Sequence, residues 1–250
     1  MICPMPKRLS IVIPAHNEAH KIGADIRAGA DFLTQQDLSG EIIVVDDAST
    51  DGTCEQARAT SVPKEVDLNI ITLAKNRGKG HAVKTGMLRS SGQTVMFADS
   101  GCCIPFETAL AGMHLIQTQD CHIAIGSRRH QKSVIVKPQG RYRQLCSWVF
   151  NRIAILKFPA LRHFHDTQCG FKVYQGDVAR ELFGDSVIDG FMFDIEILMR
   201  ALQRGYRISD FPVEWTCDHD SRLSPSKHWK AVLHDMNCIK GQTMSTHSTH

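Results

Sequence analysis

The sequence lacks several features that mark other classes of protein. It has no run of 18 apolar residues, so no segment is long enough to cross a bilayer as a helix. It also has no repeat of fixed period and no low-complexity linker. The 250 residues are enough for one large domain. We therefore expect one compact domain over residues 8–240, with residues 241–250 as a flexible tail.

Charge and cysteine usage exclude further classes. The net charge of +3 is too small to indicate nucleic acid, and no nucleic-acid partner is expected. The nine cysteines are odd in number, include no C-x-x-C pair, and follow no signal-peptide h-region. These features favour a cytoplasmic protein with free thiols. A zinc site would need a ligand spacing that Cys102, Cys103 and Cys217 do not provide.

What the sequence does contain is an alternation of strand-like and helix-like segments. In the first half, strands are expected at 8–15, 41–47, 68–74 and 94–99, and helices at 17–33, 51–60 and 78–91. In the second half, strands are expected at 121–129, 166–174 and 207–215, and helices at 141–161 and 189–206. Residues 221–236 are expected to form a basic loop that enters a helix. Continuous apolar runs indicate strands buried on both faces, and the alternation indicates parallel crossovers in an α/β fold.

Polar stretches directly follow the first four strands. They are PAHNE (14–18), DDAST (46–50), KNRGKG (75–80) and ADSG (98–101). Ligands of such sheets bind at the carboxyl ends of the strands, so these stretches are expected to converge on one edge.

Taken singly, the motifs leave alternatives open. Asp46 and Asp47 can accept hydrogen bonds from a nucleobase or ribose, or can form a turn and helix cap. Lys79 between two glycines can attract an anion at a helix N-terminus, or can belong to a glycine-rich turn. Asp194 and Glu196 do not face the same way on a helix, and are equally compatible with two solvated acids. The spacing of DTQCGFK (166–172) predicts no mechanism.

Together these stretches resemble family 2 glycosyltransferases of the GT-A fold, and among them the polyprenyl-phosphate hexose synthases, including dolichyl-phosphate mannose and glucose synthases. The matching stretches are IVIPAHNE (11–18), IIVVDDASTDGT (42–53), NRGKGHAVKTGM (76–87), FADSGCCIPFE (97–107), IGSRR (125–129), DTQCGFKVY (166–174), FMFDIEIL (191–198) and SRLSPSKHW (221–229). They keep the family's order across most of the chain. The resemblance implies a GT-A (Rossmann-like) mixed, mainly parallel sheet flanked by helices in a single domain.

The resemblance also implies the roles of individual residues. The donor-binding residues are Pro14, His16, Glu18, Asp46, Asp47, Lys79 and Arg222. Asp99 matches the first acid of the family's metal motif, whereas Gly101 stands where the second acid is expected. A site for Mg²⁺ or Mn²⁺ at Asp99 is therefore implied, weakened by one missing ligand, because Mg²⁺ can rely on one or two carboxylates plus substrate phosphates.

The implied reaction is an inverting transfer of a hexose from GDP-mannose or UDP-glucose to a polyprenyl or dolichyl phosphate. A phosphate monoester has a second pKa of about 6, so this acceptor needs no general base. Arg128 and Lys227 are then expected to hold the two phosphate-bearing partners together. One alternative is a family 2 transferase acting on a sugar hydroxyl in cell-envelope polysaccharide synthesis, with Asp194 as base. Another is a degenerate nucleotide-sugar-binding relative without activity.

A lipid acceptor implies a peripheral contact with a membrane surface. The segment 141–161 sets Leu145, Trp148, Val149, Ile153 and Leu156 near one helical face. Its basic residues, Arg141, Arg143, Arg152 and Lys157, can meet anionic headgroups. The alternatives are that the apolar residues pack on the sheet, or that a membrane partner subunit tethers the protein.

Overall fold

The structure, a computed structural model, describes residues 7–217 and 225–245. Its strands are β1 (Leu9–Ala15), β2 (Gly40–Asp46), β3 (Val66–Thr72), β4 (Thr94–Ala98), β5 (Ile123–Ser127), β6 (Val134–Lys137), β7 (Phe171–Gln175), β8 (Ile208–Pro212) and β9 (Glu214–Thr216). Its α-helices are α1 (Ile22–Gln35), α2 (Thr53–Ala59), α3 (Lys79–Arg89), α4 (Ala109–Gln117), α5 (Arg141–Lys157), α6 (Gly176–Gly184), α7 (Phe193–Gln203) and α8 (Pro225–Ser245). Two short 3-10 helices are η1 (Phe106–Thr108) and η2 (Pro159–His163).

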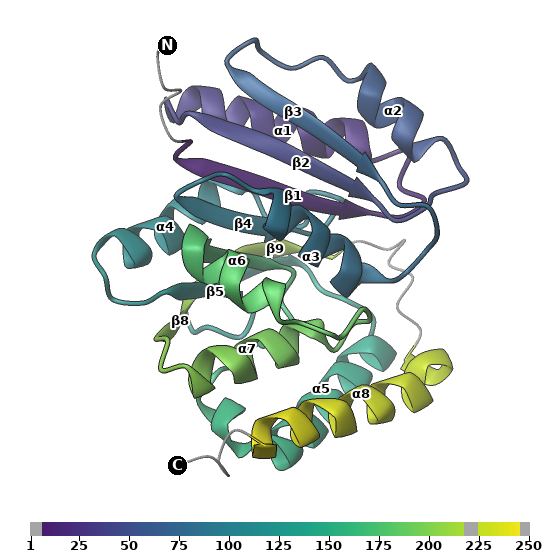
Figure 1. Cartoon of the computed structure of the whole chain (residues 1–250), viewed down its shortest axis with the longest axis vertical. Helices are drawn as coiled ribbons and strands as arrows, with labels where there is room; N and C mark the ends of the chain where they lie inside the picture. The colour runs from purple at the N-terminus through teal and green to yellow at the C-terminus, as the bar shows by residue number, and fades with distance from the viewer. Residues whose placement is uncertain (1–6, 218–224, 246–250) are drawn as a thin grey trace.

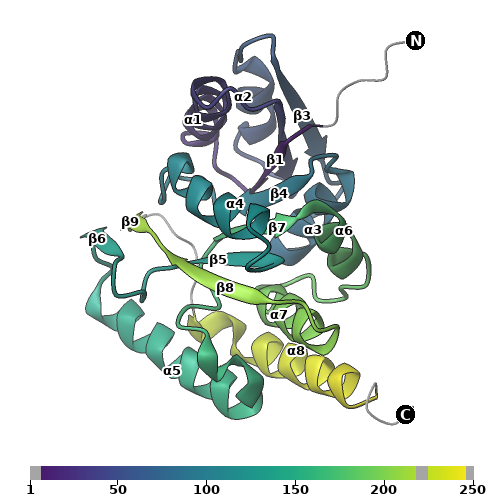
Figure 2. The same cartoon turned by 90° about the vertical axis from the view of Figure 1, so that its left-hand side faces the viewer.

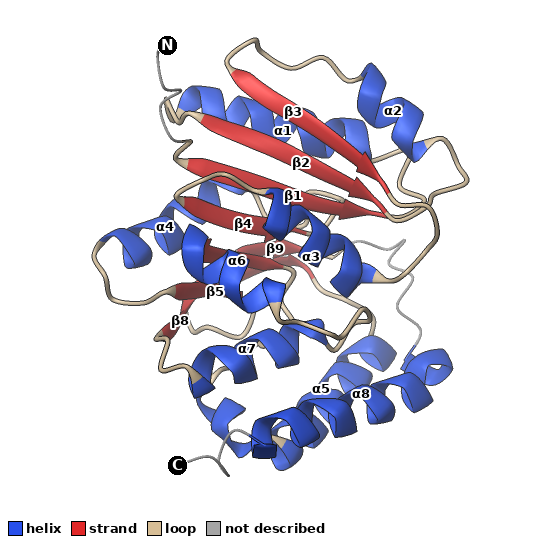
Figure 3. Cartoon of the chain, in the orientation of Figure 1, coloured by secondary structure: helices blue, strands red, loops and turns tan. Residues whose placement is uncertain are grey.

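The main sheet has seven strands in the order β3-β2-β1-β4-β7-β5-β8 (Figure 3). The pairs β1–β2, β2–β3, β1–β4 and β5–β8 are parallel. Strand β7 lies between β4 and β5 and is antiparallel to both. The predicted mixed, mainly parallel sheet flanked by helices is therefore confirmed.

Each face of the sheet is covered by helices, which explains the unbroken apolar runs in the strands (Figure 1). On one face, Val12, Val45 and Phe97 pack with buried residues of α3, α6 and α7. On the other face, Ile11 and Val44 pack with buried residues of α1 and α4. Because successive residues of a strand face opposite ways, both sets must be apolar.

Several elements differ from the sequence-based expectation. Helices α4 and α6 and strand β6 were not predicted. The strand expected at 207–215 is divided, since β8 belongs to the main sheet and β9 pairs with β6 in a second, two-stranded sheet. Helix α8 continues to Ser245, beyond the boundary expected at residue 240. Within the described residues, no helix is both long enough and apolar enough to cross a membrane.

A buried ion pair ties the antiparallel strand β7 to helix α7. Lys172 on β7 is fully buried, and its Nζ donates to Asp194 Oδ1 at 2.6 Å and to the Cys169 carbonyl at 2.6 Å. Asp194 is itself 3% exposed, and Glu196 is 1% exposed, so the interpretation of these acids as solvated is wrong. Glu196 instead accepts hydrogen bonds from the backbone N–H groups of Val187 and Ile188.

Replacing Lys172 should destabilise the fold. In Lys172→Met the Asp194 carboxylate stays buried without a counter-charge, so we expect the free energy of unfolding to fall by about 3–5 kcal/mol. Urea denaturation measures this change. The double variant Lys172→Met, Asp194→Leu removes both charges and should recover most of the loss. If Lys172→Met lowered the free energy of unfolding by less than about 1 kcal/mol, the pair would not behave as a buried ion pair, because exposed ion pairs already contribute that much.

Candidate active site

The predicted convergence of polar segments on one edge of the sheet is observed. The carboxyl ends of β1, β2 and β4 lie at this edge because these strands are parallel. Since β7 is antiparallel, its beginning lies beside the end of β4, and the Asp99 N–H donates to the Gly170 carbonyl at 2.9 Å. Strand β5 runs in the same direction as β4, so Arg128 also reaches this edge. The segment 166–170 thereby joins the site.

Asp99 lies at the centre of the edge, and its side chain is 40% exposed. Lys79, the first residue of α3, places its Nζ 2.6 Å from Oδ1 and 2.8 Å from Oδ2 of this carboxylate. Gly170 lies directly beneath, and a Cβ at that position would come within 1.9 Å of Asp99 Oδ2. The position of Asp99 therefore requires glycine at residue 170.

The residues expected to bind the nucleotide gather at the ends of β1 and β2. Pro14 lies opposite Val45 in the register of these strands. The His16 ring Nδ1 is 2.8 Å from the Asp47 carbonyl oxygen. The Asp46 carboxylate accepts hydrogen bonds from the N–H and the hydroxyl of Ser49.

Glu18 follows in the loop after β1. Its N–H donates to Thr53 Oγ1 at 2.8 Å, which fixes the loop against the start of α2. Its Oε2 lies 3.4 Å from Lys21 Nζ and accepts no hydrogen bond within the described part of the chain. This carboxylate keeps an acceptor for a ligand N–H or hydroxyl.

Asp47 connects the nucleotide side of the site to Lys79. Its two carboxylate oxygens accept hydrogen bonds from the backbone N–H groups of Arg77 and Gly78, both at 2.8 Å. The N–H of His81 donates to the Asp189 carbonyl at 3.1 Å. The amides of Arg77, Gly78 and His81, around the N-terminus of α3, are thus bonded to the protein, and the Lys79 side chain beside them is a cation that can meet an anion.

Arg128 and Arg129 differ in their surroundings. Arg128 donates to both oxygens of Asp166, at 2.6 and 2.8 Å, and its guanidinium carbon is 5.4 Å from the centre of the Trp215 ring. Burial acts against both charges, but each partner outweighs it, so the pKa of Arg128 is raised and the pKa of Asp166 is lowered. Arg129 is exposed and donates to Ser147 Oγ at 3.5 Å.

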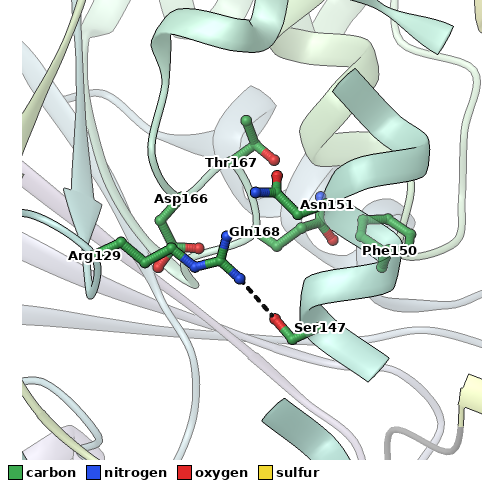
Figure 4. A pocket seen from close by; sticks show the side chains of 7 residues that line it. All are labelled: Arg129, Ser147, Phe150, Asn151, Asp166, Thr167 and Gln168. Atoms are coloured by element: carbon green, nitrogen blue, oxygen red, sulfur yellow. Dashed lines mark hydrogen bonds between the residues drawn. The ribbon is translucent and has the colours of Figure 1, made fainter. Parts of the chain in front are cut away.

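A small polar cavity lies between α5 and the segment 166–168 (Figure 4). It is lined by Arg129, Ser147, Phe150, Asn151, Asp166, Thr167 and Gln168. Figure 4 shows the Arg129 guanidinium and the Gln168 amide on the same cavity. Gln168 Nε2 is buried and donates no hydrogen bond within the described residues. The cavity therefore offers donors suited to an anionic oxygen.

The segment DTQCGFK now has a physical role at most of its positions. Asp166 pairs with Arg128, Gln168 lines the cavity, Gly170 underlies Asp99, and Lys172 pairs with Asp194. No local signal could reveal these roles, because each partner lies more than twenty residues away in sequence.

The loop where a second metal-binding acid was expected is held by Asp25 of α1. The Asp25 carboxylate accepts hydrogen bonds from Ser100 Oγ at 2.5 Å, Gly101 N–H at 2.9 Å and Cys102 N–H at 2.9 Å. Gly101 has φ of 105° and Cys102 has φ of 46°. Burial and the Asp25 carboxylate raise the pKa of the Cys102 thiol to about 12. Sequence analysis missed Asp25, which lies within an ordinary helical pattern.

Comparison with known proteins shows the family of the chain. The family described as Glycosyl transferase family 2 matches residues 10–183. The chain belongs to this family. It is 32% identical to Dolichyl-phosphate beta-glucosyltransferase of Drosophila melanogaster over 243 residues, covering 92% of this chain and 74% of that protein. It is 29% identical to the protein of the same name from Homo sapiens over 245 residues, covering 94% and 75%.

Several solved structures superpose on most of this chain. Mannosyl-3-phosphoglycerate synthase from Rubrobacter xylanophilus has a TM-score of 0.65 at 19% identity, covering 96% of this chain and 74% of that chain. Glucosyl-3-phosphoglycerate synthase from Mycobacterium tuberculosis, in complex with Mn²⁺, UDP and glucosyl-3-phosphoglycerate, has a TM-score of 0.64 at 18% identity, covering 96% and 78%. At these identities the likeness shows a GT-A-like fold.

The carboxylates near Asp99 are engaged within the protein. Asp25, Asp166 and Asp194 are each bonded to protein donors, and Lys79 already neutralises Asp99. In the described ranges, no group of three or more His, Cys, Asp or Glu side chains is arranged to hold a metal ion. Arg222 lies outside the described residues, as does the side chain of Lys227, which belongs to the first turn of α8.

Gly170→Ala should disable this glycosyltransferase while leaving its fold intact. The added methyl group occupies the space of Asp99 Oδ2 and forces the carboxylate away from Lys79. A displacement of about 1 Å in an active site can lower the rate about 100-fold, and we expect a loss of sugar transfer of that order. Gly184→Ala is the matched control, because a Cβ there meets nothing within 4 Å. Equal rates of sugar transfer for the two variants would show that the activity does not depend on the position of the Asp99 carboxylate.

Proposed function

We propose that the chain transfers glucose from a nucleoside diphosphate sugar, UDP-glucose, to a dolichyl or related polyprenyl phosphate. The observation that carries the proposal is the cavity lined by Arg129, which follows the end of β5, and Gln168, which precedes β7, at the same edge of the sheet as Asp99. A phosphate oxygen held there would lie at the same edge of the sheet as the nucleotide-side residues Asp46 and Glu18. The relatives named above act, by their names, on dolichyl phosphate with a glucosyl group.

The acidic residues support a phosphate acceptor over a sugar hydroxyl. A hydroxyl acceptor needs a base, and Asp194 was the candidate. Asp194 is buried and paired with Lys172. An ionised phosphate brings its own nucleophilic oxygen, so a buried Asp194 does not impede the reaction.

In the proposed reaction, an oxygen of the acceptor phosphate forms a bond to the anomeric carbon. The bond from that carbon to the diphosphate oxygen breaks, and its electron pair leaves with the nucleoside diphosphate. No proton is transferred, but negative charge develops on the leaving oxygen and must be stabilised. Lys79, held at Asp99, is a described cation whose placement suits this role, whereas Arg129 at the cavity suits the acceptor phosphate.

A divalent cation at Asp99, Mg²⁺ or Mn²⁺, remains a prediction of the family resemblance. Arg222 and Lys227 remain predicted phosphate ligands. Arg128, predicted to act on phosphate, is paired with Asp166, which favours a role in positioning its neighbour Arg129.

An acceptor panel tests the proposed function. We expect glucose transfer from UDP-glucose to short polyprenyl phosphates, and little transfer to free sugars or from GDP-mannose. Arg129→Ala should raise the acceptor KM about 10-fold or more while donor binding by calorimetry stays the same, since a charge-assisted hydrogen bond contributes about 1.5–3 kcal/mol. Arg89→Ala, which removes an exposed charge at the far end of α3, is the control.

The panel also separates the alternatives. Transfer to sugar hydroxyls, with phosphates inert, would support a polysaccharide transferase. Donor binding without turnover on any acceptor would support the nucleotide-sugar-binding relative.

We further propose that α5 and β6 contact the membrane surface that holds such an acceptor. Leu145, Trp148, Val149 and Leu156 form an exposed apolar face of α5, and Leu156 is 81% exposed. Ile153, predicted on the same face, packs against the core instead. Arg152 lies over the Trp148 ring, 5.3 Å from its centre. Strand β6 lies near the start of α5 (Figure 2), and its residues Val134, Ile135 and Val136 are exposed as well. Apolar residues rimmed by basic ones suit an anionic bilayer.

Liposome co-sedimentation tests the membrane contact. Binding should rise with the anionic lipid content and fall with salt. Trp148→Glu should weaken binding about 10-fold, because burying one such side chain contributes about 1.5–3 kcal/mol. Leu110→Glu, at an exposed apolar position of α4, should leave binding unchanged. If the wild-type protein ignores anionic liposomes at low salt, a membrane partner subunit becomes the better explanation.

A further inference from the structure

The ion pair between Lys79 and Asp99 occupies the place where the family pattern puts a divalent cation. Lys79 Nζ contacts both oxygens of Asp99, at 2.6 and 2.8 Å. Its side chain is 20% exposed, so the ammonium is partly accessible from the edge of the sheet. Of the three N–H donors of the ammonium, one donates to Asp99 Oδ2, while Asp99 Oδ1 accepts no hydrogen bond within the described residues although it lies 2.6 Å from Nζ. An N–H is therefore left for another acceptor.

The charge balance favours the ammonium over a metal. Two carboxylates and a divalent cation are neutral together, and so are one carboxylate and one ammonium. This chain retains Asp99 but has Gly101 at the second position. A carboxylate could not enter there without strain, because the φ of 105° at Gly101 is unfavourable for other residues. The amides of the loop are also bonded to Asp25.

Lys79 is held in place by its neighbours. Gly80 lies against residues 188–190, and a Cβ there would come within 2.6 Å of the Ile188 carbonyl oxygen. On the other side, Asp47 fixes the backbone of Arg77 and Gly78. The Phe97 ring lies beneath the ammonium, with its centre 5.9 Å from Nζ. Little reorganisation is then needed when a ligand binds, which is what stabilisation of developing charge requires.

We infer that the Lys79 ammonium, positioned by Asp99, takes the place of the divalent cation on the donor diphosphate, so that this chain binds nucleoside diphosphates without added metal. The inference rests on the proposed function, because it assumes a nucleoside diphosphate sugar as donor. When the bond from the anomeric carbon to the diphosphate breaks, the electron pair leaves on a phosphate oxygen. The third N–H of Lys79 donates to that diphosphate.

Calorimetric titration of the full chain with UDP tests the inference. We expect the affinity for UDP in EDTA to lie within about 3-fold of the affinity in Mn²⁺, since a metal that is not needed adds less than about 1 kcal/mol. Lys79→Met should weaken UDP binding in EDTA about 10- to 100-fold, the loss expected for one charged hydrogen bond. Lys84→Met is the matched control, because Lys84 lies on the same helix but donates to the Ser186 carbonyl.

A second variant distinguishes the ammonium from a metal. Asp99→Asn removes the carboxylate that a metal would require, yet leaves the Lys79 charge in place. If the inference is right, Asp99→Asn still binds UDP in EDTA. If Asp99 instead holds a metal ion, UDP binding depends on Mn²⁺ or Mg²⁺ in the wild-type protein and is lost in Asp99→Asn even when the metal is added. This result does not depend on whether Lys79→Met folds, and thermal melting checks both variants.

Each outcome decides one point. Binding of UDP by the wild-type protein only with Mn²⁺ or Mg²⁺ would overturn the inference and leave the proposed function standing. Binding in EDTA that Lys79→Met does not weaken, although the variant is folded, would also overturn it. If neither UDP nor GDP binds with or without metal, the proposed function fails as well.

Discussion

The direction of one strand determines what this site contains. Because β7 runs against β4 and β5, its first residues meet the last residues of both neighbours. Asp99 then lies on Gly170, and Arg128 faces Asp166. A fully parallel sheet would put the segment 166–170 at the opposite edge, away from the nucleotide side. The antiparallel insertion thus joins the two halves of the chain at one catalytic edge.

Three ion pairs lie at or behind this edge of the sheet. Asp166 pairs with Arg128, Asp194 with Lys172, and Asp99 with Lys79. Two of these pairs are deep in the structure and fix backbone positions, because breaking them would leave a buried charge. The third is partly exposed at this edge of the sheet. The same kind of interaction therefore fixes the backbone in the interior and leaves an accessible pair of charges at the surface.

The sequence predicted the first half of the fold well, because its strands are apolar on both faces and its helices separate them in regular order. It failed where a segment's role depends on a distant partner. Asp47 was expected to face a nucleotide, whereas its oxygens hold the loop at Arg77 and Gly78. Asp25 gave no signal, because a helical acid on an apolar face looks like an ordinary exposed position. Helix α4 and strand β6 depend on packing and pairing that periodicity does not contain.

The hydrogen bonds of Asp25 have a consequence for how this site can change over evolutionary time. The loop 100–102 is shaped around that carboxylate, with two residues in left-handed backbone conformations. A substitution of Gly101 by an acid would meet strain as long as Asp25 keeps the loop in this shape. Descent from a two-acid ancestor, or return to one, would need linked changes at positions far apart in sequence. Because of this epistasis, a single substitution at residue 101 is not expected to restore the second acid.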